Sequence, residues 1–123
     1  LDENPLDLEG WKLLARTCFM TGYIQKAEVH YTKALKYFPS NESLIYEYAV
    51  LKKNTDKLQG ALKLLKKVDV KKSKNKEIIY LYFNLLKETK NFIGLNKAMI
   101  ELENNNNISS SEKKKILERV RLN

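Results

Sequence analysis

The residues that could do chemistry in this chain are few and scattered. Its single histidine, His30, and its single cysteine, Cys18, lie twelve residues apart, whereas a zinc site takes about four such ligands. The sequence holds no glycine-rich phosphate loop and no Gly-x-Ser-x-Gly nucleophile elbow. Neighbouring acids such as Glu101 and Glu103 are typical of a solvated helix surface. We therefore expect no catalytic centre, no metal site and no cofactor, with His30 structural or superficial and Cys18 a small core side chain.

The net charge of +8 could serve binding, and it is distributed unevenly. Residues 42–75 carry nine basic and four acidic side chains, whereas residues 1–41 carry five of each. The excess is almost all lysine, which favours a solvated surface, and the alternative is a surface for nucleic acid or anionic lipid. Nucleic-acid binding needs arginines interleaved with aromatic side chains. The three arginines, Arg16, Arg119 and Arg121, lie far apart, so nucleic acid is the less favoured partner.

Length and composition indicate one helical domain. The chain has 123 residues, of which 43% are hydrophobic, with four glycines and two prolines. The longest uncharged stretches, Thr17–Gln25 and Ile78–Leu86, have nine residues each, whereas a membrane span needs about 20. The chain begins at Leu1 without a methionine, so we interpret it as an excerpt of a longer protein. Leu1–Leu6 is predicted to be a lead-in to the first helix.

A spaced set of apolar and small residues organises the chain. Trp11, Leu14 and Ala15 share one face of a first helix. Ala27, Tyr31 and Ala34 share one face of a second helix. Gly22 lies where the chain must turn between the two helices, and Pro39 cannot continue the second. This spacing resembles the tetratricopeptide repeat, a helical hairpin of about 34 residues. The set comprises Trp11, Leu14, Ala15, Gly22, Ala27, Tyr31, Ala34 and Pro39.

The same positions stay apolar from one repeat to the next without an insertion. They predict an all-α fold, a tetratricopeptide-type superhelix of three helical hairpins plus a C-terminal capping helix, in one domain of residues 1–123. The repeats span about residues 8–41, 42–75 and 76–107. The recurring sets are Trp11, Ile45 and Ile79; Leu14, Tyr48 and Tyr82; Ala15, Ala49 and Phe83; Ile24, Leu58 and Phe92; Ala27, Ala61 and Leu95; Tyr31, Leu65 and Met99; and Ala34, Val68 and Leu102.

Capping residues predict where the helices begin. Asp7 suits the N-cap of a helix from about Leu8 to Met20. The second helix is predicted from about Ile24 to Phe38, after which Ser40 or Asn41 caps the next one. Asn41 recurs one repeat later as Asn75, so the cap recurs as well.

The C-terminal end is predicted to be a linker followed by a capping helix. Asn104–Asn107 is the predicted polar linker, and Ser109 with Glu112 has the spacing of a capping box. The capping helix, about residues 109–122, carries Ile116, Leu117 and Val120 on one face. Such a helix would cover the apolar flank of the last hairpin.

A groove along the first helices of the hairpins is the predicted binding site, because those helices line the concave side of such a stack. Ile78–Leu86 carries more apolar side chains than one packed face requires. Tyr80 and Leu81 are then surplus and indicate an interaction surface; the alternative is that neighbouring helices bury both. The predicted groove residues are Leu13, Arg16, Met20, Tyr46, Val50, Tyr80, Leu81 and Asn84.

A closer resemblance covers roughly residues 4–103. The segments that carry it are Asn4-Pro5, Asp7, Glu9–Arg16, Gly22-Tyr23, Ala27, Tyr31, Lys33-Ala34-Leu35, Pro39, Tyr48-Ala49 and Gly60-Ala61. They are similar to the periplasmic tetratricopeptide domain of the CcmI/CycH family of bacterial cytochrome c maturation proteins. Cys18 departs from the family, in which a tyrosine is usual.

The resemblance implies a chaperone that recognises the C-terminal helix of apocytochrome c and presents the protein for haem ligation without forming a covalent bond. It also implies contacts with a haem chaperone and with the haem-ligation subunits. The domain would be periplasmic, with membrane-anchoring helices outside this segment. The alternative is a generic tetratricopeptide scaffold for another protein assembly, which would allow a cytoplasmic location. Whether the lysines at positions 63, 66, 67, 71, 72 and 74 form a docking patch is left open.

Overall fold

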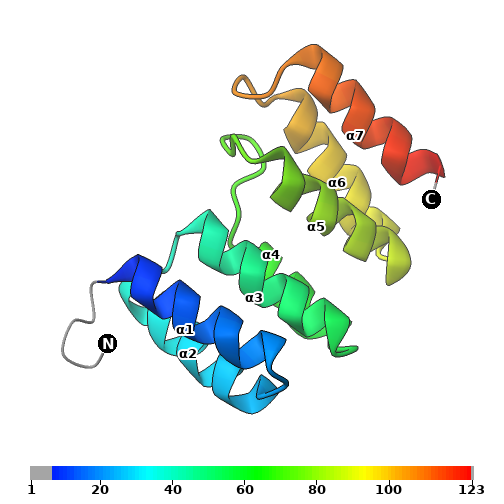
Figure 1. Ribbon diagram of the computed structural model, residues 1–123. Coiled ribbons are helices and arrows are strands. Elements are labelled where there is room, and N and C mark those ends of the chain that lie inside the picture. The colour runs from blue at the N-terminus through cyan, green and yellow to red at the C-terminus, as the bar shows by residue number, and fades with distance from the viewer. Residues whose placement is uncertain (1–6, 123) are drawn as a thin grey trace.

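The computed structural model describes residues 7–122, which form seven helices and no strand (Figure 1). The predicted all-α fold is therefore confirmed for the described residues. The predicted lead-in, Leu1–Leu6, lies outside them. The helices are α1 (Leu8–Met20), α2 (Ile24–Tyr37), α3 (Glu42–Asn54), α4 (Leu58–Leu65), α5 (Lys76–Glu88), α6 (Phe92–Glu103) and α7 (Ser110–Leu122).

Every second helix begins at a constant interval. α1, α3, α5 and α7 begin at residues 8, 42, 76 and 110, and each has 13 residues. These starts are equally spaced and match the predicted repeat, and we call this spacing the repeat register. The predicted boundaries of α1 and α7 are thus correct, and α2 ends one residue before the predicted Phe38. The terminal helix α7 occupies the position that the first helix of a fourth pair would take.

The helices pack as consecutive pairs. α1 packs against α2, α3 against α4, and α5 against α6, while α2–α3 and α4–α5 contacts join one pair to the next. α7 packs against α5 and α6. Figure 1 shows the pairs following one another from blue to red, with α1 and α7 at opposite ends of the described residues. The fold is therefore extended along the order of the pairs.

The core follows the recurring apolar positions. Trp11, Ile45 and Ile79 are at most 2% exposed, and the three side chains at the Ala15 position are fully buried. Phe92 is the exception, with 59% of its surface exposed. It is the first residue of α6, and a helical side chain leans toward the N-terminus of its helix. The predicted core position at Phe92 is therefore wrong.

The turns inside the three pairs share one backbone conformation. Gly22, Asp56 and Lys90 occupy the same position of the repeat register and have φ values of 88°, 60° and 59°. The sharp turn predicted at Gly22 is confirmed. In each turn the amide N–H of the next residue donates a hydrogen bond of 2.8 Å to a carbonyl five residues earlier. The repeat geometry thus persists at the two positions where the residue is not glycine.

A threonine precedes each of these left-handed residues. Its hydroxyl donates to the carbonyl four residues earlier, over 2.7, 2.9 and 2.8 Å in the three pairs. The threonine is the same residue type in every pair, so it is a stronger mark of the repeat than most of the core positions. The three residues are Thr21, Thr55 and Thr89.

Most predicted caps form. The Asp7 carboxylate accepts from the Gly10 amide over 2.9 Å, and Asn41, rather than Ser40, caps α3. Asn75 caps α5, as the recurrence predicts. The capping box at α7 forms only in part. The Ser109 hydroxyl accepts from the Glu112 amide, but the Glu112 carboxylate pairs with Lys76 and Lys115.

The second pair departs from the other two because α4 is short. α4 has 8 residues, whereas α2 has 14 and α6 has 12. After Leu65 the chain continues to Asn75 without a regular helix. Val68 and Val70 nevertheless remain buried, so the repeat register survives the loss of about one and a half helical turns.

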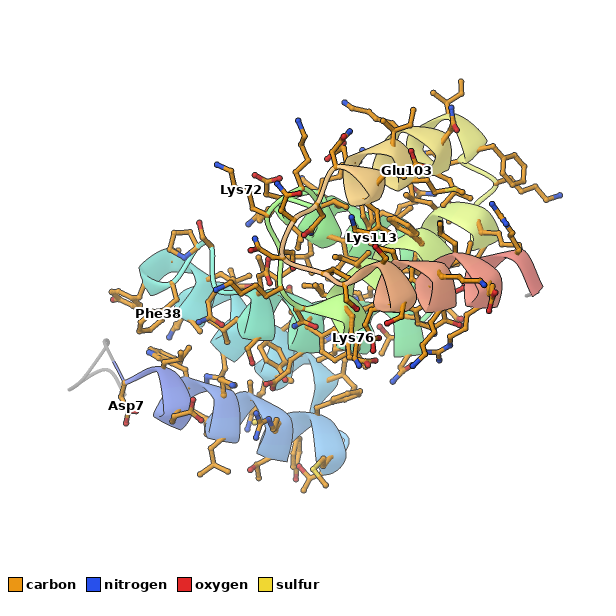
Figure 2. All side chains as sticks on the ribbon, turned by 90° about the horizontal axis from the view of Figure 1, so that it is seen from above. Asp7, Phe38, Lys72, Lys76, Glu103 and Lys113 are labelled. Atoms are coloured by element: carbon orange, nitrogen blue, oxygen red, sulfur yellow. The ribbon has the colours of Figure 1, made fainter. Side chains whose placement is uncertain are left out.

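The predicted polar linker Asn104–Asn107 is partly wrong, because Asn105 is fully buried. Its side-chain amide donates to the carbonyls of Val70 and Ser73 over 2.7 and 2.9 Å. Its carbonyl oxygen accepts from the amides of Asn107 and Ile108. Asn105 therefore fastens the loop between α6 and α7 to the loop between α4 and α5. Figure 2 labels Lys72 and Glu103 in this part of the molecule.

Candidate protein-interaction surface

A hollow of about 400 Å³ opens beside α1 and α3. Three predicted groove residues, Arg16, Tyr46 and Val50, line it, so the structure brings these three together. We call it the α1–α3 hollow. Its lining consists of Arg16 and Phe19 from α1, Tyr31 from α2, and Ser43, Tyr46, Glu47 and Val50 from α3.

One carboxylate, that of Glu47, organises the polar wall of this hollow. The Arg16 guanidinium donates to both Glu47 oxygens, over 2.9 and 2.8 Å. The Tyr31 hydroxyl donates to Glu47 over 3.1 Å, and the Lys12 ammonium lies 3.7 Å away. The Glu47 side chain is only 16% exposed. The bidentate contact fixes the orientation of Arg16 relative to Glu47.

The shifted pKa values of Glu47 and Tyr31 keep each side chain in one protonation state near neutral pH. Burial opposes ionisation of Glu47, but the hydrogen bond and charge of Arg16 outweigh it and hold the pKa below its usual value. Burial, together with the charge and hydrogen bond of Glu47, raises the pKa of the Tyr31 hydroxyl. Glu47 therefore stays ionised and Tyr31 stays a donor, which suits recognition of a polar backbone or side chain.

The apolar wall consists of half-buried side chains. Phe19, Tyr46 and Val50 pack against the core while keeping part of their surface accessible. The predicted groove residues Leu13 and Met20 are 64% and 84% exposed on α1, but they are not part of the lining. Accessible apolar surface beside an ordered ion pair is typical of an interaction site.

The predicted groove residues on α5 are Tyr80, Leu81 and Asn84, and their surroundings differ from the expectation. Leu81 is only 7% exposed, so its assignment as surplus apolar surface is wrong. α5 contacts α4, α6 and α7, and it therefore buries more than one face, including Ile78 and Leu85. The alternative, that neighbouring helices bury the surplus residues, holds for Leu81. Asn84 is half-buried on the same helix.

Helix α7 packs over Tyr80. The Arg119 guanidinium lies 3.9 Å from the centroid of the Tyr80 ring, a cation–π contact. The Lys87 ammonium donates to the carbonyl of Val120 and so ties the end of α7 to α5. At the other end of α7, Lys76 pairs with Glu112 over 3.3 Å. Tyr80 thus belongs to a second, smaller hollow of about 300 Å³ between α5 and α7, separate from the lining of the α1–α3 hollow.

Phe19 is not among the predicted site residues, whereas the repeat geometry turns Glu47 toward the groove and its contact with Arg16 has a signal in the sequence. In the repeat register Glu47 corresponds to Leu13, and Arg16 corresponds to Val50. Arg16 and Glu47 are therefore one helical turn apart on the shared face of adjacent first helices. Opposite charges at these two positions predict the contact that the structure contains.

No group of three or more His, Cys, Asp or Glu side chains in residues 7–122 is arranged to hold a metal ion. In the same range, no helix combines the length and apolarity that crossing a bilayer requires. Cys18 is a half-buried free thiol packed against the core. No protein-family model, curated protein or solved structure matches this chain.

Proposed function

We propose that this protein is a peptide-binding module of the tetratricopeptide type, built as a superhelix of three hairpins with α7 as its cap. The constant interval between the starts of α1, α3, α5 and α7 supports this proposal. The left-handed residue that recurs in every turn supports it as well. In such a stack the first helix of each pair faces the binding side, which is where the α1–α3 hollow opens.

The observation that carries the proposal is the pairing of apolar and fixed polar groups in the α1–α3 hollow. Phe19, Tyr46 and Val50 offer accessible apolar surface, and aromatic side chains in such positions anchor partners. The Arg16–Glu47 pair offers oriented charge that sets the register of a bound segment. An amphipathic helix laid into the hollow would use both.

The partner we propose is the C-terminal helix of an apocytochrome c, and the role is that of a chaperone in cytochrome c maturation. This assignment rests on the resemblance of residues 4–103 to the CcmI/CycH family. It places the domain in the periplasm, with membrane anchorage outside this segment. We further propose that a haem chaperone and the haem-ligation subunits contact the same domain. The protein would hold and present the unfolded chain without covalent chemistry.

Titration of the domain with the C-terminal helix peptide of an apocytochrome c tests the proposal by fluorescence anisotropy. We expect saturable binding, and we expect Tyr46→Ala to weaken it by about fivefold or more, because loss of a hot-spot aromatic costs at least about 1 kcal/mol. Tyr23→Ala is the matched control. Tyr23 is 59% exposed in the turn before α2 and is not part of the hollow.

Two outcomes would contradict different parts of the proposal. Equal affinity for a scrambled peptide of the same composition would reject apocytochrome c as the partner. Specific binding that Tyr46→Ala leaves unchanged would reject the α1–α3 hollow as the site. Circular dichroism of each variant separates a loss of binding from a loss of folding.

A further inference from the structure

A set of lysines around the short helix α4 is not neutralised by ion pairing. No member forms a salt bridge with any residue in the described range 7–122. By contrast, Lys52 and Lys57 share the carboxylate of Glu28. Figure 2 shows one member, Lys72, at the outer edge of its loop. The set comprises the exposed residues Lys63, Lys66, Lys67, Lys71, Lys72, Lys74 and Lys97.

Two of these lysines border a hollow of about 410 Å³ between the chain that follows α4 and helices α5 and α6. The hollow lies beside the irregular chain that follows α4, which ends at Leu65. The corresponding stretch of the first pair, up to Tyr37, is helical. We call it the α6 hollow. Buried Val68 and Val70 contribute to its apolar lining.

The rim of the α6 hollow is mixed but mainly basic. Lys66 and Lys97 line it together with a single acid, Glu101. Ile93 adds an apolar rim and is 88% exposed. A ligand that presents carboxylates beside one apolar side chain would match this lining, since the lysines would gain partners and the apolar floor would be covered.

The α6 hollow is formed before any partner binds. Asn105 holds the carbonyls of Val70 and Ser73, and the Asn107 side chain donates to the carbonyl of Lys72 over 2.8 Å. These bonds fix the loop that carries part of the lysine set. A preformed site avoids the entropy cost of ordering a loop on binding.

The geometry points to a second binding site: the α6 hollow takes an acidic peptide segment of a partner protein, with one apolar side chain in the hollow and flanking carboxylates on the lysines. A protein partner fits better than nucleic acid, because neither the lining of the hollow nor residues 66–75 contain an arginine. The one aromatic side chain in the lining, Tyr82, is partly buried against the core, so it offers little face for stacking on bases. This site lies on different elements from the α1–α3 hollow, so it goes beyond the proposed function.

Fluorescence anisotropy with a labelled peptide of aspartates and glutamates around one leucine tests the site on the intact domain. A second peptide with serine in place of leucine isolates the apolar contribution. We expect the leucine peptide to bind, and Lys66→Glu with Lys97→Glu to weaken it at least about tenfold. Lys33→Glu with Lys36→Glu, two exposed positions on α2, is the charge-matched control and should lose much less affinity.

The apolar part of the proposal is tested separately with Ile93→Ser, which changes an exposed side chain and leaves the core intact. We expect this variant to weaken the leucine peptide about threefold and to leave the serine peptide unchanged. Equal binding of both peptides to the wild type would overturn the role of the hollow. Equal loss in both double lysine variants would show non-specific attraction and would overturn the site.

The remaining partners of a basic surface are outcomes of the same experiment. Single-stranded RNA and vesicles of phosphatidylglycerol with phosphatidylcholine are titrated under identical salt conditions. Tighter binding of either of them than of the leucine peptide, lost in Lys66→Glu with Lys97→Glu, would overturn the assignment to an acidic peptide. Weaker binding of both supports it. Neither result bears on Tyr46, so failure here and failure of the proposed function are distinguishable.

Discussion

The junction between the first two helical pairs and the junction between the second and third differ in chemistry. At the first, Glu47 and Glu28 each form ion pairs with two basic side chains of the other helical pair. At the second, no described acid forms an ion pair with the lysines between α4 and α5. The connection there consists of hydrogen bonds: the Ser73 hydroxyl donates to the Glu42 carboxylate, and the Asn105 amide donates to the carbonyls of Val70 and Ser73. Both junctions keep the same repeat register.

The repeat register and the charge at the junctions therefore have separate causes. Buried apolar positions set where each helix lies, because they recur in every pair. Apart from the capping residues Asn41 and Asn75, the polar residues that connect the pairs do not recur, so each junction acquires its own charge. Burial opposes ionisation of Glu28, yet its hydrogen bonds to Lys52 and Lys57 lower its pKa. The first junction therefore pairs its charges with one another, and the second leaves its lysines without an ionic partner among the described residues.

Removing the side chain of Asn105 should have the largest effect on the free energy of unfolding, because it breaks the hydrogen bonds of the second junction. Asn105→Ala leaves two buried carbonyls and two amide N–H groups without their partners, and we expect the free energy of unfolding to fall by about 3 kcal/mol. Urea denaturation followed by circular dichroism measures it. Asn106→Ala, an exposed neighbour, is the control, and equal stability of the two variants would contradict the fastening role.

Neutralising Glu47 should weaken the first junction by less. Glu47→Gln should lower the free energy of unfolding by about 1 kcal/mol at pH 7, a modest value because Arg16 is half exposed. The folded-state pKa of Glu47 lies below the unfolded value of about 4.3. The stabilisation is therefore present above that pH and lost as the pH falls through the folded pKa.

Denaturation at pH 7 and at about pH 3 checks this sign. The gap between wild type and Glu47→Gln should narrow at the lower pH. Glu88→Gln, on an exposed glutamate of α5, is the matched control for the change of charge. A gap that widens on acidification would contradict the role assigned to Arg16 and Glu47.

Substitutions in the turns should change the free energy of unfolding least. All three pairs share this turn, so opposite substitutions can be compared at equivalent positions. Gly22→Ala should lower the free energy of unfolding by about 1 kcal/mol, since a β-carbon there meets no neighbour within 4 Å and the cost is that of the left-handed backbone alone. Lys90→Gly should raise it by about 0.5–1 kcal/mol for the same reason. Thermal denaturation measures both, and shifts of the same sign would contradict a common turn geometry.

Much of the fold was predictable from local pattern. The bounds of α1 and α7 and the caps at Asp7 and Asn75 follow from short-range preferences, which act within one helical turn. Of the candidate site, Arg16, Tyr46 and Val50 were predictable because the repeat register places them on one side. The length of α4 was not predictable, because residues beyond Leu65 keep the apolar spacing of a helix while tertiary contacts bury them in a loop.

The sequence by itself determined the helices, their constant interval and the apolar positions that form the core, since those depend on local propensity and periodic burial. Only the tertiary structure decided which polar residues meet. It buried Leu81 on α5, which packs against α4, α6 and α7. It placed Arg119 over Tyr80, because α7 folds back onto α5. It also placed Asn105 beside carbonyls of the loop that precedes α5. Contacts between distant segments depend on the position of whole helices, which no single stretch of residues encodes.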